Sequence, residues 1–85
     1  MRLIGRERLI GLYGTGAQAW LSSWIAEVIA ANWKQPLDVR HQFPKAIHKG
    51  ECNFRFPIDN GAATVDLLIA FPQGIALITD LKVEQ

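Results

Sequence analysis

Apolar residues recur at two different spacings along the chain, and the change of spacing separates a helical half from a sheet-forming half. From residue 17 to residue 31 they recur every three or four positions, which predicts an amphipathic helix. From residue 53 onward they alternate with polar residues, the period of a strand with one buried face. The pattern therefore predicts an α+β fold in which N-terminal helices pack on a small antiparallel sheet.

The helix over 17–31 carries a start signal of its own. Thr15 stands at the expected N-cap position, and Gln18 three residues later completes a capping box. The side chains that share its apolar stripe are expected to be buried. They are Ala17, Trp20, Leu21, Trp24, Val28 and Ala31.

Shorter elements flank this helix. Residues 1–4 are an expected edge strand, and residues 6–13 fit a short helix. Pro36 can open a second helix, because a missing N–H costs nothing in the first helical turn, and Pro44 ends it. We expect Leu37, Val39 and Phe43 to form the buried side of that segment.

The second half predicts a meander of about three strands. Asn60 and Gly61 are a strong two-residue hairpin signal, and their loop pairs Asp59 with Ala62. The inward rows are Phe54, Phe56 and Ile58; then Val65, Leu67, Ile69 and Phe71; then Ile75, Leu77 and Leu81.

The two turns also predict which residues face each other. The first turn places Phe56 opposite Val65 and Arg55 opposite Asp66. A three-residue loop over 72–74 places Phe71 opposite Ile75, Ile69 opposite Leu77 and Asp66 opposite Asp80. This register keeps the apolar rows on one face and puts Arg55, Asp66 and Asp80 in a row on the other.

At 85 residues, with 49% hydrophobic and 20% charged residues, the chain is predicted to form a single globular domain over 1–85. No apolar run is long enough to span a bilayer, and we find no signal-like segment. The only cysteine is Cys52, which excludes an intrachain disulfide. We therefore expect a cytoplasmic protein without a membrane association.

Charge is distributed unevenly although the net charge is only +1. Residues 1–55 sum to +4 and residues 56–85 to −3. The basic group consists of Lys34, Arg40, Lys45, Lys49 and Arg55. Such a group can contact the phosphates of a nucleic acid, although solvated surface charge gives the same count.

Other candidate chemistry is weaker. His41 and His48 lack the closely spaced partners of a metal site, so each is either a surface histidine or a proton carrier near neutral pH. Residues 14–19 match a glycine-rich dinucleotide pattern, but no parallel strand–helix–strand unit surrounds them. Stacking of bases on Trp33 stays open, whereas Trp20 and Trp24 are expected in the core. We expect no cofactor and no metal.

One segment resembles a known family. Residues 31–46 read Ala-Asn-Trp-Lys-Gln-Pro-Leu-Asp-Val-Arg-His-Gln-Phe-Pro-Lys-Ala, and this stretch is similar to the A-N-W-K-x-P…F-P-x-A block of HigB-type toxins. The similarity continues in outline over about residues 17–78. It implies a RelE-like fold, with helices on one side of an antiparallel sheet.

The resemblance also implies a function. HigB-type toxins belong to type II toxin–antitoxin pairs, cut mRNA on the translating ribosome, and are held inactive by a helix-turn-helix antitoxin of the HigA type. The implied reaction is attack of a ribose 2′-OH on its own 3′ phosphate, in which basic residues neutralise the phosphate. Carried onto this chain, Lys49 and Arg55 would neutralise the phosphate and His48 would carry the proton. Lys34, Arg40 and Lys45 would hold RNA.

The chain differs from the family in two places where catalytic residues are expected. Residues 62–65 read Ala-Ala-Thr-Val where family members carry a basic, aromatic strand, and residues 79–85 lack the family's histidine and tyrosine tail. Thr64 and Thr79 occupy the positions of family arginines. The resemblance therefore implies one of two functions: a ribosome-dependent mRNA endonuclease, or a weakened or inactive relative that binds an antitoxin-like protein or RNA. If the match of residues 31–46 is fortuitous, the chain is an unrelated small interaction domain.

Overall fold

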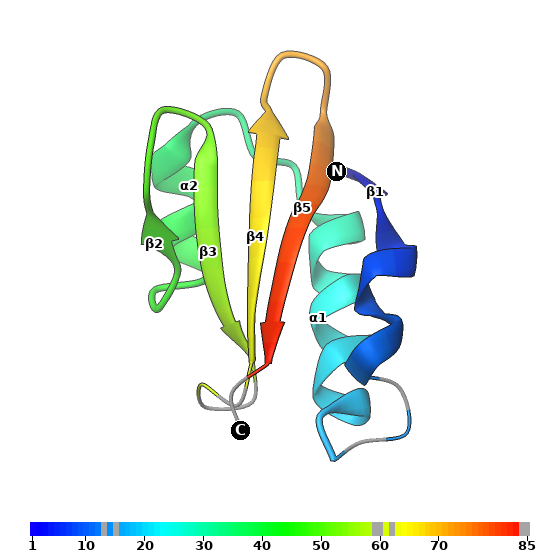
Figure 1. The fold of residues 1–85 in the computed structure, drawn as a ribbon. Helices are drawn as coiled ribbons and strands as arrows, with labels where there is room; N and C mark the ends of the chain where they lie inside the picture. The colour runs from blue at the N-terminus through cyan, green and yellow to red at the C-terminus, as the bar shows by residue number, and fades with distance from the viewer. Residues whose placement is uncertain (13, 15, 59–60, 62, 84–85) are drawn as a thin grey trace.

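The computed structural model describes residues 1–12, 14, 16–58, 61 and 63–83. Their secondary structure follows one order along the chain (Figure 1). It comprises strand β1 (Arg2–Ile4), the 3-10 helix η1 (Arg6–Leu12), helices α1 (Gln18–Ala30) and α2 (Pro36–Gln42), and strands β2 (Ile47–His48), β3 (Asn53–Ile58), β4 (Ala63–Ala70) and β5 (Ile75–Val83). No helix in this part of the chain is long and apolar enough to cross a membrane.

The five strands form one mixed sheet in the order β1-β5-β4-β3-β2. The predicted meander is its centre, β3-β4-β5, and its two antiparallel pairs are present. The edges differ from the expectation of an antiparallel sheet of about three strands. Residues 2–4 do form an edge strand, but it runs parallel to β5, and the two-residue strand β2 was not predicted.

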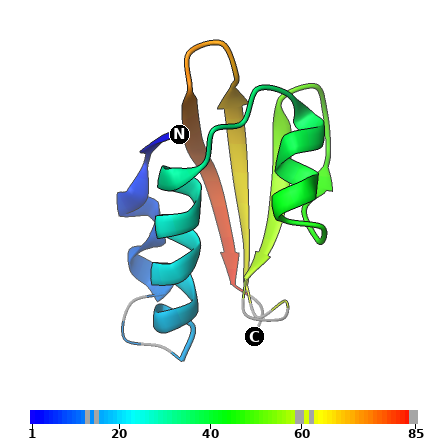
Figure 2. The ribbon, with the colours of Figure 1, turned by 180° about the vertical axis from the view of Figure 1, so that it is seen from behind.

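All three helices cover the same face of the sheet (Figure 2). In this view η1 and α1 lie over the β1–β5 side, and α2 lies over the β3–β2 side. None of the described helices lies on the opposite face, and we call it the open face. The N-terminal ammonium, next to the edge strand β1, donates hydrogen bonds to the carbonyls of Ile29 and Ala31 at the C-terminal end of α1.

The core lies between the helices and the inward rows of the three central strands. Trp24 of α1 is 1% exposed, and its ring packs edge-on to Phe56 with the ring centres 5.6 Å apart. Trp33 is also buried and donates from Nε1 to Oε1 of Gln42 at 3.0 Å. The other fully enclosed large side chains are Leu9, Leu21, Val28, Val39, Phe54, Ile58, Val65, Leu67, Ile69 and Ile78.

The helices begin and end close to the predicted residues. The structure has 18–30 for the predicted 17–31, and Pro36 stands at the start of α2 as expected. Two side chains of the predicted buried stripes are exposed instead: Trp20 is 37% exposed and Leu37 is 54% exposed. Trp20 lies in the first turn of α1, where it lines a cavity together with Phe43 and Phe56, and Leu37 lies in the first turn of α2. The predicted N-cap at Thr15 and the turn residues Asp59, Asn60 and Ala62 lie outside the described residues.

The register of β3 with β4 is as predicted, with Phe56 opposite Val65 and Arg55 opposite Asp66. The register of β4 with β5 matches the prediction only from the Asp66–Asp80 pair to the C-terminal end of β5. Asp66 faces Asp80 as expected, but Ala70 and not Phe71 faces Ile75, so Leu77 points to the open face and Ala76 and Ile78 point inward. The turn causes this shift, because the Gly74 N–H donates to the Phe71 carbonyl and Phe71 belongs to the loop.

A bulge restores the predicted pairing farther along the two strands. The register shifts by one residue between Asp66 and Leu67, so that Thr79 has no partner of its own on β4. Its hydroxyl donates to the Asp66 carbonyl at 3.2 Å. Because of this extra residue, Leu81 points to the core although Leu77, four residues earlier, points to the open face. Both ends of β5 therefore place apolar side chains in the core.

Candidate functional site

The open face of the sheet carries a row of charged side chains across β3, β4 and β5. Arg55 lies opposite Asp66, which lies opposite Asp80. The Arg55 Nε donates to Oδ1 of Asp66 at 2.9 Å, and its Nη2 donates to Oδ2 at 3.4 Å. Both side chains are partly shielded from solvent, at 26% and 21% exposure. The predicted row is therefore present, and two of its members form an ion pair.

This pairing changes the proton affinity of both groups. The hydrogen bond from Arg55 lowers the pKa of the Asp66 carboxyl below its ordinary value, and the charges of Arg55, Lys49 and Lys82 act in the same direction, against the opposing effect of burial. The same contact with Asp66 raises the pKa of Arg55, and Asp80 adds to it. Arg55 is thus held as a cation whose charge is already compensated.

Lys49 joins this row from the loop after β2. It lines a hollow of about 240 Å³ together with Asn53, Phe54, Asp66 and Thr79. Its backbone N–H donates to the Asn53 carbonyl at 2.8 Å, which fixes the turn between β2 and β3. The structure therefore brings Lys49 and Arg55 to one face, as the sequence hypothesis requires.

His48 lies elsewhere. It is the neighbour of Phe54 in the β2–β3 pair, and its ring stacks on the Phe54 ring with centres 4.6 Å apart and planes 5° apart. Phe54 points into the core, so His48 lies at the edge of the helix-covered face, opposite to Arg55. The His48 Nε2 lies 3.2 Å from the Glu51 carbonyl, to which it can donate. The predicted trio of His48, Lys49 and Arg55 is therefore split between two faces.

The three predicted RNA-holding residues also lie apart from the open face. Lys34 precedes α2, and its backbone N–H donates to the Asp38 carboxylate at 2.9 Å. Arg40 lies on α2 with an exposed side chain. Lys45 follows α2 and lines a cavity between the helices. These side chains belong to the helix-covered side of the molecule, so the basic group does not form one continuous surface with Lys49 and Arg55.

Other features of the open face were not predicted. Its upper part is apolar, with Ile4, Leu68 and Leu77 exposed side by side on β1, β4 and β5. Its lower part adds Lys82 beside Asp66. Period alone could not place Leu77 and Thr79 here, because the turn shifts Leu77 by one residue and the bulge leaves Thr79 without a partner on β4. No group of histidine, cysteine and acidic residues suited to a metal ion is present in the described ranges.

Comparison with family models and with curated proteins finds no match for this chain.

Proposed function

We propose that this chain is the toxin-type member of a type II toxin–antitoxin pair, with a RelE-like fold, and that it acts by binding its partners rather than by cutting RNA. The observation that carries the second half of this proposal is the ion pair of Arg55 with Asp66, 2.9 Å long. The partners are a helix-turn-helix antitoxin of the HigA type and RNA on the ribosome.

The first half rests on the HigB-like block of residues 31–46. Its signature side chains serve the packing of the domain: Trp33, Val39 and Ala46 are buried, and Phe43 packs edge-on to Phe56 with ring centres 5.3 Å apart. The hydrogen bond between Trp33 and Gln42 joins two residues of this block. The residues that resemble HigB-type toxins therefore serve to pack α2 against the sheet, and this supports the proposed RelE-like fold more directly than the proposed reaction.

Cleavage of RNA by its own 2′-OH needs cationic groups free to meet the phosphate and a proton carrier within reach of the same atoms. Here the Asp66 carboxylate accepts a hydrogen bond from the guanidinium of Arg55, and a second carboxylate, that of Asp80, lies opposite Asp66. His48 lies across the sheet from Arg55. The threonines at 64 and 79 supply no replacement charge. This arrangement favours binding over cleavage.

The second candidate is a ribosome-dependent mRNA endonuclease, as the resemblance implies. The observation in its favour is the hollow of about 240 Å³ on the open face, which Lys49 lines and Arg55 adjoins through Asp66. A phosphate that displaced Asp66 from Arg55 would meet two cations there.

The two candidates are separated by translating a reporter mRNA on purified ribosomes in the presence of the purified chain, and mapping new 5′ ends. The binding proposal predicts no new ends, together with a stable complex on co-expression with the helix-turn-helix protein of the neighbouring reading frame. New ends that vanish in Arg55→Gln but persist in the matched Lys34→Gln variant would replace it with the endonuclease. If the neighbouring frame encodes no such protein and no complex forms, the toxin–antitoxin assignment is wrong.

A further inference from the structure

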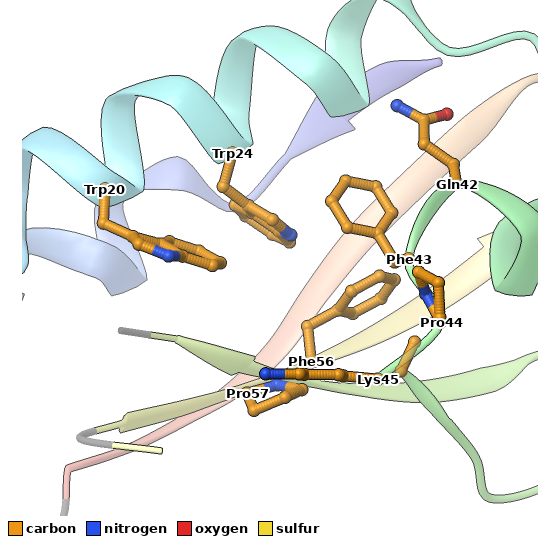
Figure 3. A pocket seen from close by; sticks show the side chains of 9 residues that line it. Trp20, Trp24, Gln42, Phe43, Pro44, Lys45, Phe56 and Pro57 are labelled. Atoms are coloured by element: carbon orange, nitrogen blue, oxygen red, sulfur yellow. The ribbon is translucent and has the colours of Figure 1, made fainter. Parts of the chain in front are cut away.

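A cavity opens between α1 and α2 on the helix-covered face (Figure 3). Its volume is about 260 Å³. Trp20 and Trp24 form one wall, Phe43 and Pro44 the other, and Phe56 and Pro57 of β3 the floor. An apolar cavity of about 150 Å³ accepts benzene, so this one has room for roughly ten to twelve non-hydrogen atoms.

The wall of the cavity contains an unused hydrogen-bond donor. The Trp24 Nε1 is buried and has no partner, and it is the one buried side-chain nitrogen or oxygen in this condition among the described residues. A buried donor left without an acceptor costs stability, and most buried indole N–H groups have a partner. Trp33, only nine residues farther on, donates its own N–H to Gln42. In Figure 3 the Trp24 nitrogen lies on the side of the ring that is turned toward Phe43 and Phe56.

The two ends of the cavity differ in charge, with a positive charge at the end where Lys45 lies. Lys45 is the charged residue among those that line it, and it also lines the adjoining hollow beside Trp20, Pro57 and Gly61. At the opposite end a further hollow is lined by Glu27, Gln42 and the two tryptophans. A bound anion is therefore attracted toward Lys45 and repelled from the Glu27 end.

We propose that this cavity binds a small aromatic or aliphatic carboxylic acid, with its apolar body between Trp20, Phe43 and Phe56 and its carboxylate between the Trp24 N–H and Lys45. The body replaces empty space by apolar contact, which is the main favourable term for such a site. The carboxylate supplies the acceptor that Trp24 lacks. The donor is covered while the cavity is empty, so binding moves the surrounding side chains, of which Trp20 is the most exposed aromatic one. This site is separate from the open face and does not depend on the proposed function.

The proposal is tested on the full chain with 1-naphthoate as the probe, because its two rings match the volume. The chain has three tryptophans, so a ¹⁵N–¹H correlation spectrum contains three indole N–H signals. Trp20→Phe and Trp33→Phe assign two of them and leave the third to Trp24. Naphthoate is expected to shift the Trp24 signal downfield in a saturable way, with a dissociation constant of about 1 mM or tighter for a ligand of this size. The Trp33 signal stays in place, because its donor is already engaged.

Matched probes and variants test the charge. The amide 1-naphthamide keeps the shape and the acceptor without the charge, and 1-naphthylmethylammonium reverses the charge. We expect naphthoate to bind about two- to fivefold more tightly than the amide, the scale of an exposed ion pair, and the ammonium to bind most weakly. Lys45→Gln removes the preference for naphthoate, whereas Lys49→Gln, the same change in a different hollow, leaves it. An unshifted Trp24 signal up to the solubility limit of naphthoate overturns the site, and equal binding of naphthoate and the ammonium overturns the choice of a carboxylic acid.

Discussion

Arg55 on β3 and Asp66 on β4 face each other on the open side of the sheet and are joined by two hydrogen bonds, of 2.9 and 3.4 Å. The contact links strands that are neighbours in the sheet and only one hairpin apart in the chain. It compensates the charge of Arg55 on this face. The electrostatics of the open face therefore depend on whether this carboxylate is present and ionised.

Removing the carboxylates should expose the charge of Arg55. The double variant Asp66→Asn, Asp80→Asn is expected to bind single-stranded RNA more tightly than the natural chain at low salt, because two repelling charges are gone and Arg55 is free. Fluorescence anisotropy at two salt concentrations measures this. The salt dependence should also become steeper, since more counterions are released. Unchanged RNA affinity would show that RNA does not meet the open face, and loss of cleavage in the double variant would make the carboxylates catalytic.

The same pair should make stability depend on acidity. The pKa of Asp66 is lowered in the folded state, so the folded chain binds fewer protons there than the unfolded chain. The stabilisation is complete above the ordinary carboxyl pKa of about 4 and is lost as the pH falls through the lower, folded pKa. Urea unfolding midpoints should therefore decline between pH 5 and pH 2 by less in Asp66→Asn or Arg55→Gln than in the natural chain, with Lys49→Gln intermediate. An equal decline in all four proteins would contradict the role of the pair.

The two exposed lysines should have different effects, because they lie on different sides of the molecule. Lys49→Glu is expected to weaken RNA binding and to flatten its salt dependence, since it lines the hollow beside Asp66. Lys45→Glu, which lies at the cavity between the helices, should leave RNA affinity nearly unchanged. The sequence alone grouped both lysines in one RNA-binding surface. Equal losses in the two variants would restore that grouping.

Local patterns predicted much of this structure. The period of apolar residues placed α1 within one residue at each end, and the proline at 36 placed the start of α2. The prediction failed where contacts between residues distant in sequence decide whether a side chain is buried. Trp20 and Trp24 share a helical stripe, but only Trp24 is covered, because Trp20 lines an open cavity with Phe43 and Phe56 and stays 37% exposed. The cavity beside Trp24 is a consequence of that incomplete cover, and no period in the sequence marks it.

The two tryptophans of α1 offer a matched test of this difference. Trp24→Ala should lower the free energy of unfolding by about 3–5 kcal/mol, the usual loss for a fully buried large aromatic side chain. Trp20→Ala, the same change four residues earlier on a side chain that is 37% exposed, should cost clearly less. Urea unfolding followed by far-ultraviolet circular dichroism gives both values. A loss below about 1 kcal/mol for Trp24→Ala would mean that the helix is rotated from the position described.

In the candidate site, too, the features set by neighbouring residues were predicted and those set by residues distant in sequence were not. The hairpin register correctly predicted that Arg55 faces Asp66, because a turn of known length fixes it. It could not predict where His48 lies, since β2 is a two-residue strand held by Phe54 and by the turn that follows. It also missed the tighter turn after β4, which shifts the first half of β5 by one residue, and the bulge at Thr79, which ends that shift. A pattern of inward and outward residues does not reveal an extra residue when both registers bury apolar side chains.

The bulge leads to a prediction about deletions in β5. Removing Thr79 takes out the one residue without a partner on β4, so Ile78 stays inward, Asp80 stays opposite Asp66, and Leu81 stays inward on an unbroken strand. The loss is the hydrogen bond from its hydroxyl to the Asp66 carbonyl, worth about 1 kcal/mol. Deleting Leu77 instead moves Ile78 to the open face and puts Thr79 in its place in the core, at a cost of about 2 kcal/mol or more.

Urea unfolding of the two deletion variants measures the difference, and amide correlation spectra show whether the fold is kept. The Thr79 deletion is expected to retain a cooperative transition near that of the natural chain, with a spectrum altered mainly along β4 and β5. The Leu77 deletion is expected to be much less stable, although it removes a side chain that is 36% exposed. If the two deletions are equally harmful, Thr79 is not an extra residue and the strands pair without a bulge. If the Thr79 deletion is the worse of the two, the hydroxyl contact to Asp66 holds the charged row together and not merely the strand edge.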